Sequence, residues 1–175
     1  MCEGAREDDW GKLKQVMKYL KGTERAKITL QADSLNIIKG WVDTTLASHH
    51  NCIGQSGGMI SLGAGAVISK STKQRINGKI STDSEIIAVN DFMGEVLNTL
   101  YFMGAQGYNM AHNIMFQDNQ SNTRRMLNGK RSSTKQTKHM NVKYFFMTDV
   151  IKRGDMSVEN CLTGDMGAAV LTNPL

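Results

Sequence analysis

The amino-acid sequence predicts an α/β fold in which helices pack on a mixed sheet. Two observations predict it. Short β-rich runs follow one another early in the chain, as in an antiparallel meander, whereas the later part alternates helices with strands, as where strands run parallel. The length of 175 residues and the hydrophobic content of 40% suit one compact domain with a short appendage.

The first half of the chain begins with an amphipathic helix. Apolar residues recur at helical spacing from Asp9 to Leu20, and Gly22 follows as a C-cap. A polar loop is expected over residues 46–58, because its sequence, LASHHNCIGQSGG, has no strand-like run. The expected strands lie on both sides of this loop, at residues 28–30, 37–42, 59–62 and 66–69.

The second half contains the longest periodic stretch. Thr82 and Glu85 form a capping-box pattern, and the helix that they open is expected to tolerate Gly94 at a cost of about 1 kcal/mol relative to Ala. A later helix is expected within residues 134–153, with Val142, Phe145, Phe146 and Val150 facing inward. The remaining expected elements are strands at 113–117 and 157–161, a short helix at 121–127 and a terminal helix at 165–172.

The composition indicates which cellular compartment and which classes of binding partner to expect. The net charge of +5 favours an anionic partner, either nucleic acid or an acidic membrane surface. The three cysteines, Cys2, Cys52 and Cys161, form no CxxC pair or zinc-binding pattern, which fits a reducing compartment. No run approaches the roughly 20 apolar residues of a membrane span, so a soluble protein of the cytoplasm or nucleus is expected.

Three carboxylates fall at the junctions of the expected elements. Asp43 ends a strand, Glu85 opens the long helix and Asp118 ends the strand NIMFQ. Carboxylates grouped at strand ends without His or Cys partners suit a hard cation such as Mg²⁺, and two such ions can hydrolyse a phosphodiester. Read singly, Asp43 and Asp118 are also ordinary turn residues, and Glu85 is also an ordinary capping-box partner.

Seven segments occur in an order that is typical of one family. Among them are YLKGT, GWVDTTLA, SGG, STDSE, QDNQS and LTNPL, and together they resemble the ribonuclease H region of copia-type retrotransposon Pol polyproteins. The resemblance extends over nearly the whole chain, and the segments that carry it lie at residues 8–23, 40–50, 54–74, 81–89, 117–121, 137–149 and 171–175.

The resemblance implies a fold, a reaction and a partner. The fold is the ribonuclease H-like one, a five-stranded mixed sheet flanked by helices, over residues 27–175. Residues 1–26 would be a linker helix from the reverse transcriptase of the parent polyprotein. The reaction is cleavage of the RNA strand of RNA–DNA hybrids with two Mg²⁺ ions, for which Mn²⁺ can substitute. Asp43, Glu85 and Asp118 match the catalytic, metal-binding carboxylates.

The basic stretch from Arg124 to Lys143, which contains seven Lys or Arg residues and no acid, fits the hybrid-binding role because cations along a nucleic-acid backbone supply most non-specific affinity. A solvated charged face is the alternative. Side chains after Asp118 suit contacts with phosphate or a ribose 2′-hydroxyl, and they suit helix capping equally well. The candidate nucleic-acid contacts are Asn119, Gln120, Ser121, Arg124, Arg125, Lys130, Arg131, Lys135, Lys138 and His139.

The chain departs from the family at its end. Ala169 stands where the family has a fourth catalytic aspartate. Asp165 is a possible substitute, because four residues on a helix are about one turn, roughly 6 Å, although it also suits a helix N-terminus. The sequence therefore predicts a nuclease impaired at its fourth ligand, and the alternative is an inactive nucleic-acid-binding remnant.

Overall fold

The computed structural model describes residues 7–46, 53–75, 81–119 and 138–172, and of residues 81–83 and 138–144 the backbone alone. The described residues form two compact units, one before residue 30 and the other from residue 30 onward. In the first unit, α1 (Glu7–Gly22) has acidic residues in its first turn and Lys21 in its last, an arrangement that favours the helix dipole. The predicted N-terminal helix is confirmed.

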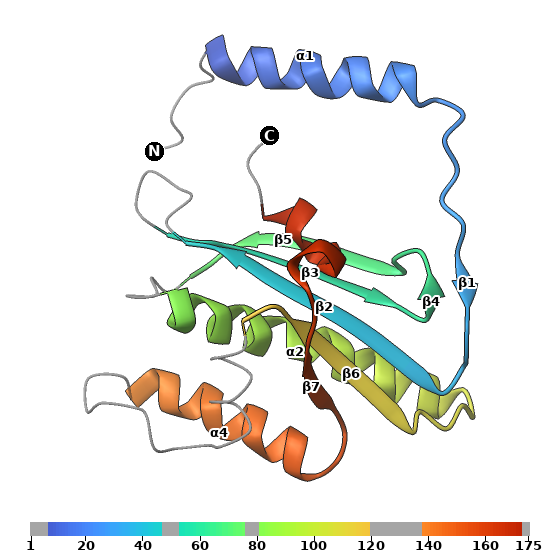
Figure 1. Cartoon of the computed structure of the whole chain (residues 1–175), viewed down its shortest axis with the longest axis vertical. Coiled ribbons are helices and arrows are strands. Elements are labelled where there is room, and N and C mark those ends of the chain that lie inside the picture. Colours follow the sequence, from blue (N-terminus) through green and yellow to red (C-terminus); the bar gives the residue numbers. More distant parts are fainter. Residues whose placement is uncertain (1–6, 47–52, 76–80, 120–137, 173–175) are drawn as a thin grey trace. The chain divides into compact units, whose positions relative to one another are not determined.

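The second unit is built on a five-stranded sheet, shown in Figure 1. The strand order is β5-β3-β2-β6-β7. β2 pairs antiparallel with β3 and β3 with β5, whereas β2 with β6 and β6 with β7 run parallel, so the predicted mixed sheet is confirmed. The strands are β2 (Ile37–Thr45), β3 (Gln55–Ser61), β5 (Ile68–Lys73), β6 (His112–Gln117) and β7 (Ser157–Asn160).

A separate two-stranded sheet accounts for one difference from the prediction. β1 (Gln31–Ala32) pairs antiparallel with β4 (Gly63–Ala64), whereas the strand was expected at residues 28–30. Ile28 is 81% exposed, and among the described residues the β-rich run at 28–30 pairs with no strand.

Helices cover one face of the five-stranded sheet (Figure 1). α2 (Ser81–Ala105) packs on β2 and β3, and α4 (Lys138–Lys152) packs on α2. The apolar face predicted for the long helix forms most of the core, which includes Ile86, Val89, Met93 and Val96 together with strand residues such as Ile38, Val42 and Met115. In α4, Met147 and Val150 are buried.

Two predicted details of the helices are wrong. Phe145 and Phe146 were expected to face inward but are 52% and 41% exposed, because α4 packs mainly on α2 and buries a narrow stripe that includes Met147 and Val150. The predicted α-helix at 165–172 is instead two 3₁₀ turns, η1 (Thr163–Asp165) and η2 (Gly167–Leu171). Met166 lies between them at φ −75° and ψ 86°, a conformation that interrupts a continuous helix.

Residues 55–58 begin β3, although the sequence predicts a loop there. Glycine is disfavoured in strands, but here both faces of the strand are covered closely. A Cβ at Gly57 would lie 2.8 Å from the Cβ of Leu171, and one at Gly58 would lie 2.4 Å from the Phe92 ring. Since successive strand residues point to opposite faces, η2 lies on one face of β3 and α2 on the other. Tertiary packing therefore decides the start of this strand.

We expect Gly58→Ala to lower the free energy of unfolding by about 2 kcal/mol, because the added methyl group would overpack against Phe92. Gly94→Ala is the matched control. No atom lies within 4 Å of a Cβ at Gly94, which is exposed inside α2, so this variant should gain up to about 1 kcal/mol. Urea unfolding measures both changes. Equal destabilisation by the two variants would contradict the packing described for Gly58.

The predicted short helix at 121–127 lies outside the described residues. Among the helices that the structure describes, none combines the length and the apolar character needed to cross a bilayer.

Candidate active site

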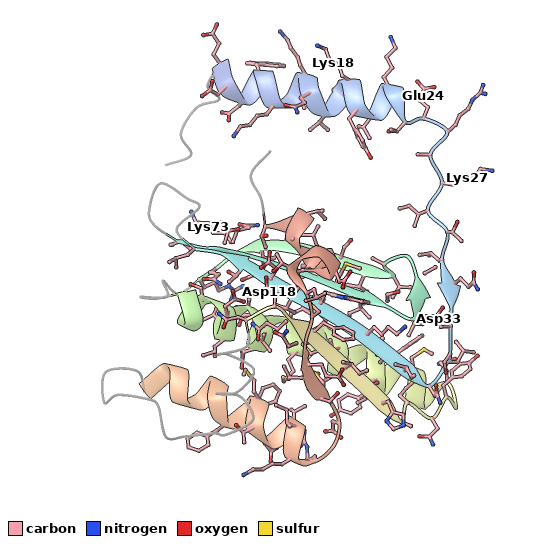
Figure 2. The ribbon with its side chains drawn as sticks, in the orientation of Figure 1. Lys18, Glu24, Lys27, Asp33, Lys73 and Asp118 are labelled. Atoms are coloured by element: carbon pink, nitrogen blue, oxygen red, sulfur yellow. The ribbon has the colours of Figure 1, made fainter. Side chains whose placement is uncertain are left out.

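Three carboxylates come together at one edge of the sheet. Asp43 lies near the end of β2, Asp118 directly follows β6 (Figure 2), and Glu85 lies in the first turns of α2. One oxygen of each lies within 4.8 Å of the others. β2 and β6 are adjacent and parallel, so both strands end at the same edge. The structure thus brings together the three residues that the sequence singled out.

Glu85 is buried at this edge, with 5% of its surface exposed. Gln117 Nε2 donates to Glu85 Oε2 over 3.0 Å. The pKa of Glu85 is raised to about 8, mainly by burial; the hydrogen bond from Gln117 lowers it, whereas the charges of Asp43 and Asp118 contribute to the increase. A residue that served only to cap α2 would not need this environment.

The pKa of Asp118 is shifted in the same direction as that of Glu85. Burial raises the pKa of Asp118, the charge of Asp43 adds to the increase, and a hydrogen bond from Thr163 opposes it. A cation bound between the three carboxylates would stabilise the ionised forms of Glu85 and Asp118, whose pKa values are raised. Because all three ligand groups offer oxygen, the donor set fits a hard divalent ion such as Mg²⁺.

Two residues at the site escaped prediction from the sequence. Gln117 is fully buried and holds Glu85, as described above. Thr172 is 3% exposed, and its Oγ1 donates to Asp43 Oδ2 over 2.6 Å. Both lie inside segments that carry the family resemblance, QDNQS and LTNPL, and that position was the available signal.

The end of the chain reaches the site through η2, which packs on β2 and β3. Ala169, the residue at the expected fourth position, lies half-buried in η2. Asp165 is exposed at the end of η1 and is not a member of the three-carboxylate group. The α-helical spacing that related Asp165 to Ala169 is wrong, because Met166 separates two 3₁₀ turns.

The predicted nucleic-acid contacts fall mostly outside the described residues. Asn119 is half-buried beside Asp118. Lys138 and His139 lie in the first turn of α4, where the backbone alone is described. The remaining predicted contacts, Gln120, Ser121, Arg124, Arg125, Lys130, Arg131 and Lys135, lie between residues 120 and 137, outside the described ranges.

A basic cleft lies one strand away from Asp43, which pairs with Gly57 across β2 and β3. Its volume is about 440 Å³, and β3, β5 and α2 form its walls. Lys70 in the cleft is paired with Glu95 over 2.7 Å. The polar and charged lining residues are Ser56, Lys70, Thr72, Lys73, Arg75 and Asp91. Cations therefore outnumber acids along this cleft.

Comparison with known proteins gives relatives by sequence. No protein-family model matches the chain. The chain is similar to the retrovirus-related Pol polyprotein from transposon TNT 1-94 of Nicotiana tabacum, with 23% identity over 171 residues, and to that from transposon RE2 of Arabidopsis thaliana, with 26% identity over 171 residues. Each match covers 97% of this chain, which spans only 13% and 12% of the two polyproteins.

Solved structures with a similar fold include ribonucleases H. LC11-RNase H1, isolated from compost by a metagenomic approach, superposes with a TM-score of 0.57 at 14% identity, over 79% of this chain and 94% of that one. Its complex with an RNA/DNA hybrid gives 0.55 at 13% identity, over 77% and 92%. The protease–reverse transcriptase of prototype foamy virus gives 0.51 at 11% identity, over 83% and 22%.

The sequence and fold comparisons agree with each other. The sequence relatives are retrotransposon Pol polyproteins, matched along nearly the whole chain, and the structural neighbours have the ribonuclease H fold. The mixed five-stranded sheet and the carboxylates at its edge were predicted from the same resemblance. The chain therefore has the ribonuclease H fold, and along nearly its whole length it is similar in sequence to retrotransposon Pol polyproteins.

Proposed function

We propose that the chain is a metal-dependent endonuclease of the copia type that hydrolyses the RNA strand of RNA–DNA hybrids. The observation that carries the proposal is the grouping of Asp43, Glu85 and Asp118, with ligand oxygens within 4.8 Å of one another. The similar LC11-RNase H1 has been solved with an RNA/DNA hybrid, which supports this substrate class.

The three carboxylates would hold two Mg²⁺ ions, or Mn²⁺ in their place. Bound there, the ions would supply an activated water and stabilise the leaving oxygen of the phosphodiester. Asp43, which the resemblance matches to a catalytic, metal-binding aspartate, lies on the central strand β2. Gln117 orients Glu85 through its hydrogen bond, and this contact holds a buried carboxylate in place for an incoming cation.

Backbone phosphates of the hybrid are the expected ligands of the basic cleft. Lys70 pairs with Glu95, whereas neither Lys73 nor Arg75 belongs to an ion pair among the residues that the structure describes, and both side chains are exposed. The basic stretch from Arg124 to Lys143 would extend this grip, and Asn119, Gln120 and Ser121 would contact the ribose 2′-hydroxyl that distinguishes RNA.

A reverse transcriptase is the expected partner. The chain spans about an eighth of the Pol polyproteins that it resembles, and the foamy virus protein with a similar domain is a protease–reverse transcriptase. We propose that residues 1–26, which contain α1, link the ribonuclease H domain over residues 27–175 to that polymerase.

A second candidate function is favoured by one observation. Ala169 leaves the site without its fourth carboxylate, and Asp165 does not join the three that are present. A domain that retains the basic cleft but cuts slowly, or not at all, would act as a hybrid-binding remnant. Under either function the activity of the natural chain is impaired.

The test uses the full chain with a hybrid labelled on its RNA strand. We expect slow RNA-strand cleavage with Mg²⁺ or Mn²⁺, none with a chelator, and no cleavage of duplex DNA. Binding without cleavage at any metal concentration would favour the remnant. Absence of binding would contradict both candidates.

Salt dependence tests the basic cleft separately from catalysis. We expect Lys73→Ala and Arg75→Ala each to reduce the slope of log affinity against log salt by about 1. Lys39→Ala is the matched control, because Lys39 pairs with Asp33 over 3.0 Å at the start of β2. Figure 2 shows Asp33 and Lys73 at opposite ends of the sheet. Equal slopes for all three variants would mean that the hybrid does not enter this cleft.

A further inference from the structure

We propose that Thr172 is a positioning residue whose hydroxyl fixes the Asp43 carboxylate in the orientation that metal binding requires. The inference rests on the proposed function and goes beyond it, because the three-carboxylate set does not include this residue. Thr172 follows η2, and Asp43 lies 129 residues earlier in β2. The contact joins the end of the chain to the central strand of the sheet.

The hydroxyl of Thr172 has a choice of two acceptors. Its Oγ1 lies 2.6 Å from Asp43 Oδ2 and 3.0 Å from the Ala169 carbonyl oxygen. A hydroxyl carries a single proton, and a hydrogen bond to an ionised carboxylate is shorter and stronger than one to a neutral carbonyl. The proton therefore goes to Asp43, and one of the two carboxylate oxygens is held by the protein itself.

Thr172 is itself held in place from three directions. Thr45 Oγ1 donates to the Thr172 carbonyl over 3.1 Å, and Ser71 Oγ donates to the carbonyl of the preceding Leu171 over 2.5 Å. The methyl group of Thr172 packs closely on Gly57: a Cβ added at Gly57 would lie only 2.8 Å from it. With 3% of its surface exposed, Thr172 cannot turn without breaking these contacts, so the orientation that it imposes on Asp43 is rigid.

This arrangement gives the end of the chain a role that does not need a carboxylate at residue 169. The segment contributes a fixed neutral donor and no negative charge. Asp43 offers its remaining lone pairs from a defined position, and partners of this kind around a ligand group typically change metal affinity by roughly 10 to 100-fold.

The test measures Mn²⁺ binding to the full chain without nucleic acid. Thr172→Val removes the hydroxyl and keeps the shape of the side chain, whereas Thr172→Ser keeps the hydroxyl. Ser71→Ala is the matched control, because it loosens the docking of Leu171 without touching Asp43. We expect affinity to fall about tenfold or more in Thr172→Val and to change less than about twofold in the other two.

A double-mutant cycle between Thr172→Val and Asp43→Ala, measured by unfolding in the absence of metal, tests the contact itself. We expect the unfolding constants to show at least about tenfold coupling, as for a hydrogen bond to a charged group. Coupling near one, unchanged Mn²⁺ affinity in Thr172→Val, or an equal loss in Ser71→Ala would overturn the inference. Clear coupling in a chain that binds no Mn²⁺ would instead contradict the proposed function.

Discussion

Without divalent metal, the protein is expected to lose roughly 5 kcal/mol of its free energy of unfolding as the pH rises from about 4.5 to about 8. Glu85 has its ordinary pKa of 4.5 in the unfolded chain and a pKa of about 8 in the fold. Between these values the unfolded chain gives up the proton first. The stabilisation of the fold by protonated Glu85 is therefore complete below pH 4.5 and is lost as the pH rises through about 8.

Glu85→Gln isolates this effect, because it keeps the size of the side chain and removes its charge. Urea unfolding of both proteins between pH 4.5 and 8.5 should give a steep decline for the natural chain and a much flatter line for the variant. Asp118, whose pKa is also raised, should leave a smaller decline in the variant. Parallel profiles for the two proteins would show that Glu85 is not buried beside two like charges.

Added metal should remove most of the decline. An ion that binds the folded chain stabilises it in proportion to the logarithm of its concentration, and it binds best when the carboxylates are ionised. At pH 8, saturating Mn²⁺ should therefore raise the melting temperature of the natural chain far more than that of Glu85→Gln, and a chelator should reverse the increase. Equal shifts for both proteins would place the bound ion elsewhere.

Ala169→Asp is expected to raise metal-dependent cleavage of the hybrid by roughly 10 to 100-fold or more, since even a partner of a metal ligand has an effect of that size. η2 carries residue 169 onto β2 and β3, and Thr172, three residues later, contacts Asp43 directly. A carboxylate added to this segment would supply the ligand that the family has at this position. The measurement is the initial rate of RNA-strand shortening.

Val170→Asp is the matched control. Val170 is 79% exposed on the same 3₁₀ turn, so this substitution adds the same charge on the solvent side. It should leave the rate unchanged. Asp43→Asn in the Ala169→Asp background should lower the rate at least about 100-fold, since it removes a ligand from the central strand. A natural chain that cuts as fast as Ala169→Asp would show that the fourth carboxylate is dispensable here.

The sequence by itself determined the order of the elements and the carboxylates of the site. Helical and strand periodicities are local properties, so α1, α2, β2 and β6 could be predicted from neighbouring residues. Asp43, Glu85 and Asp118 stand where those elements begin or end, and the ordered motifs pointed to the same three residues. Ala169 was identified by its distance from the end of a motif.

Only the tertiary structure decided the contacts between distant segments. β3 begins at Gln55 because α2 and η2 cover its two faces, and no local propensity reveals that. The raised pKa of Glu85 depends on burial against Gln117 and on the charges of two other elements. The bond from Thr172 to Asp43 spans 129 residues. Burial and long-range hydrogen bonds arise when separate elements pack together, so their geometry could not be read from the chain one segment at a time.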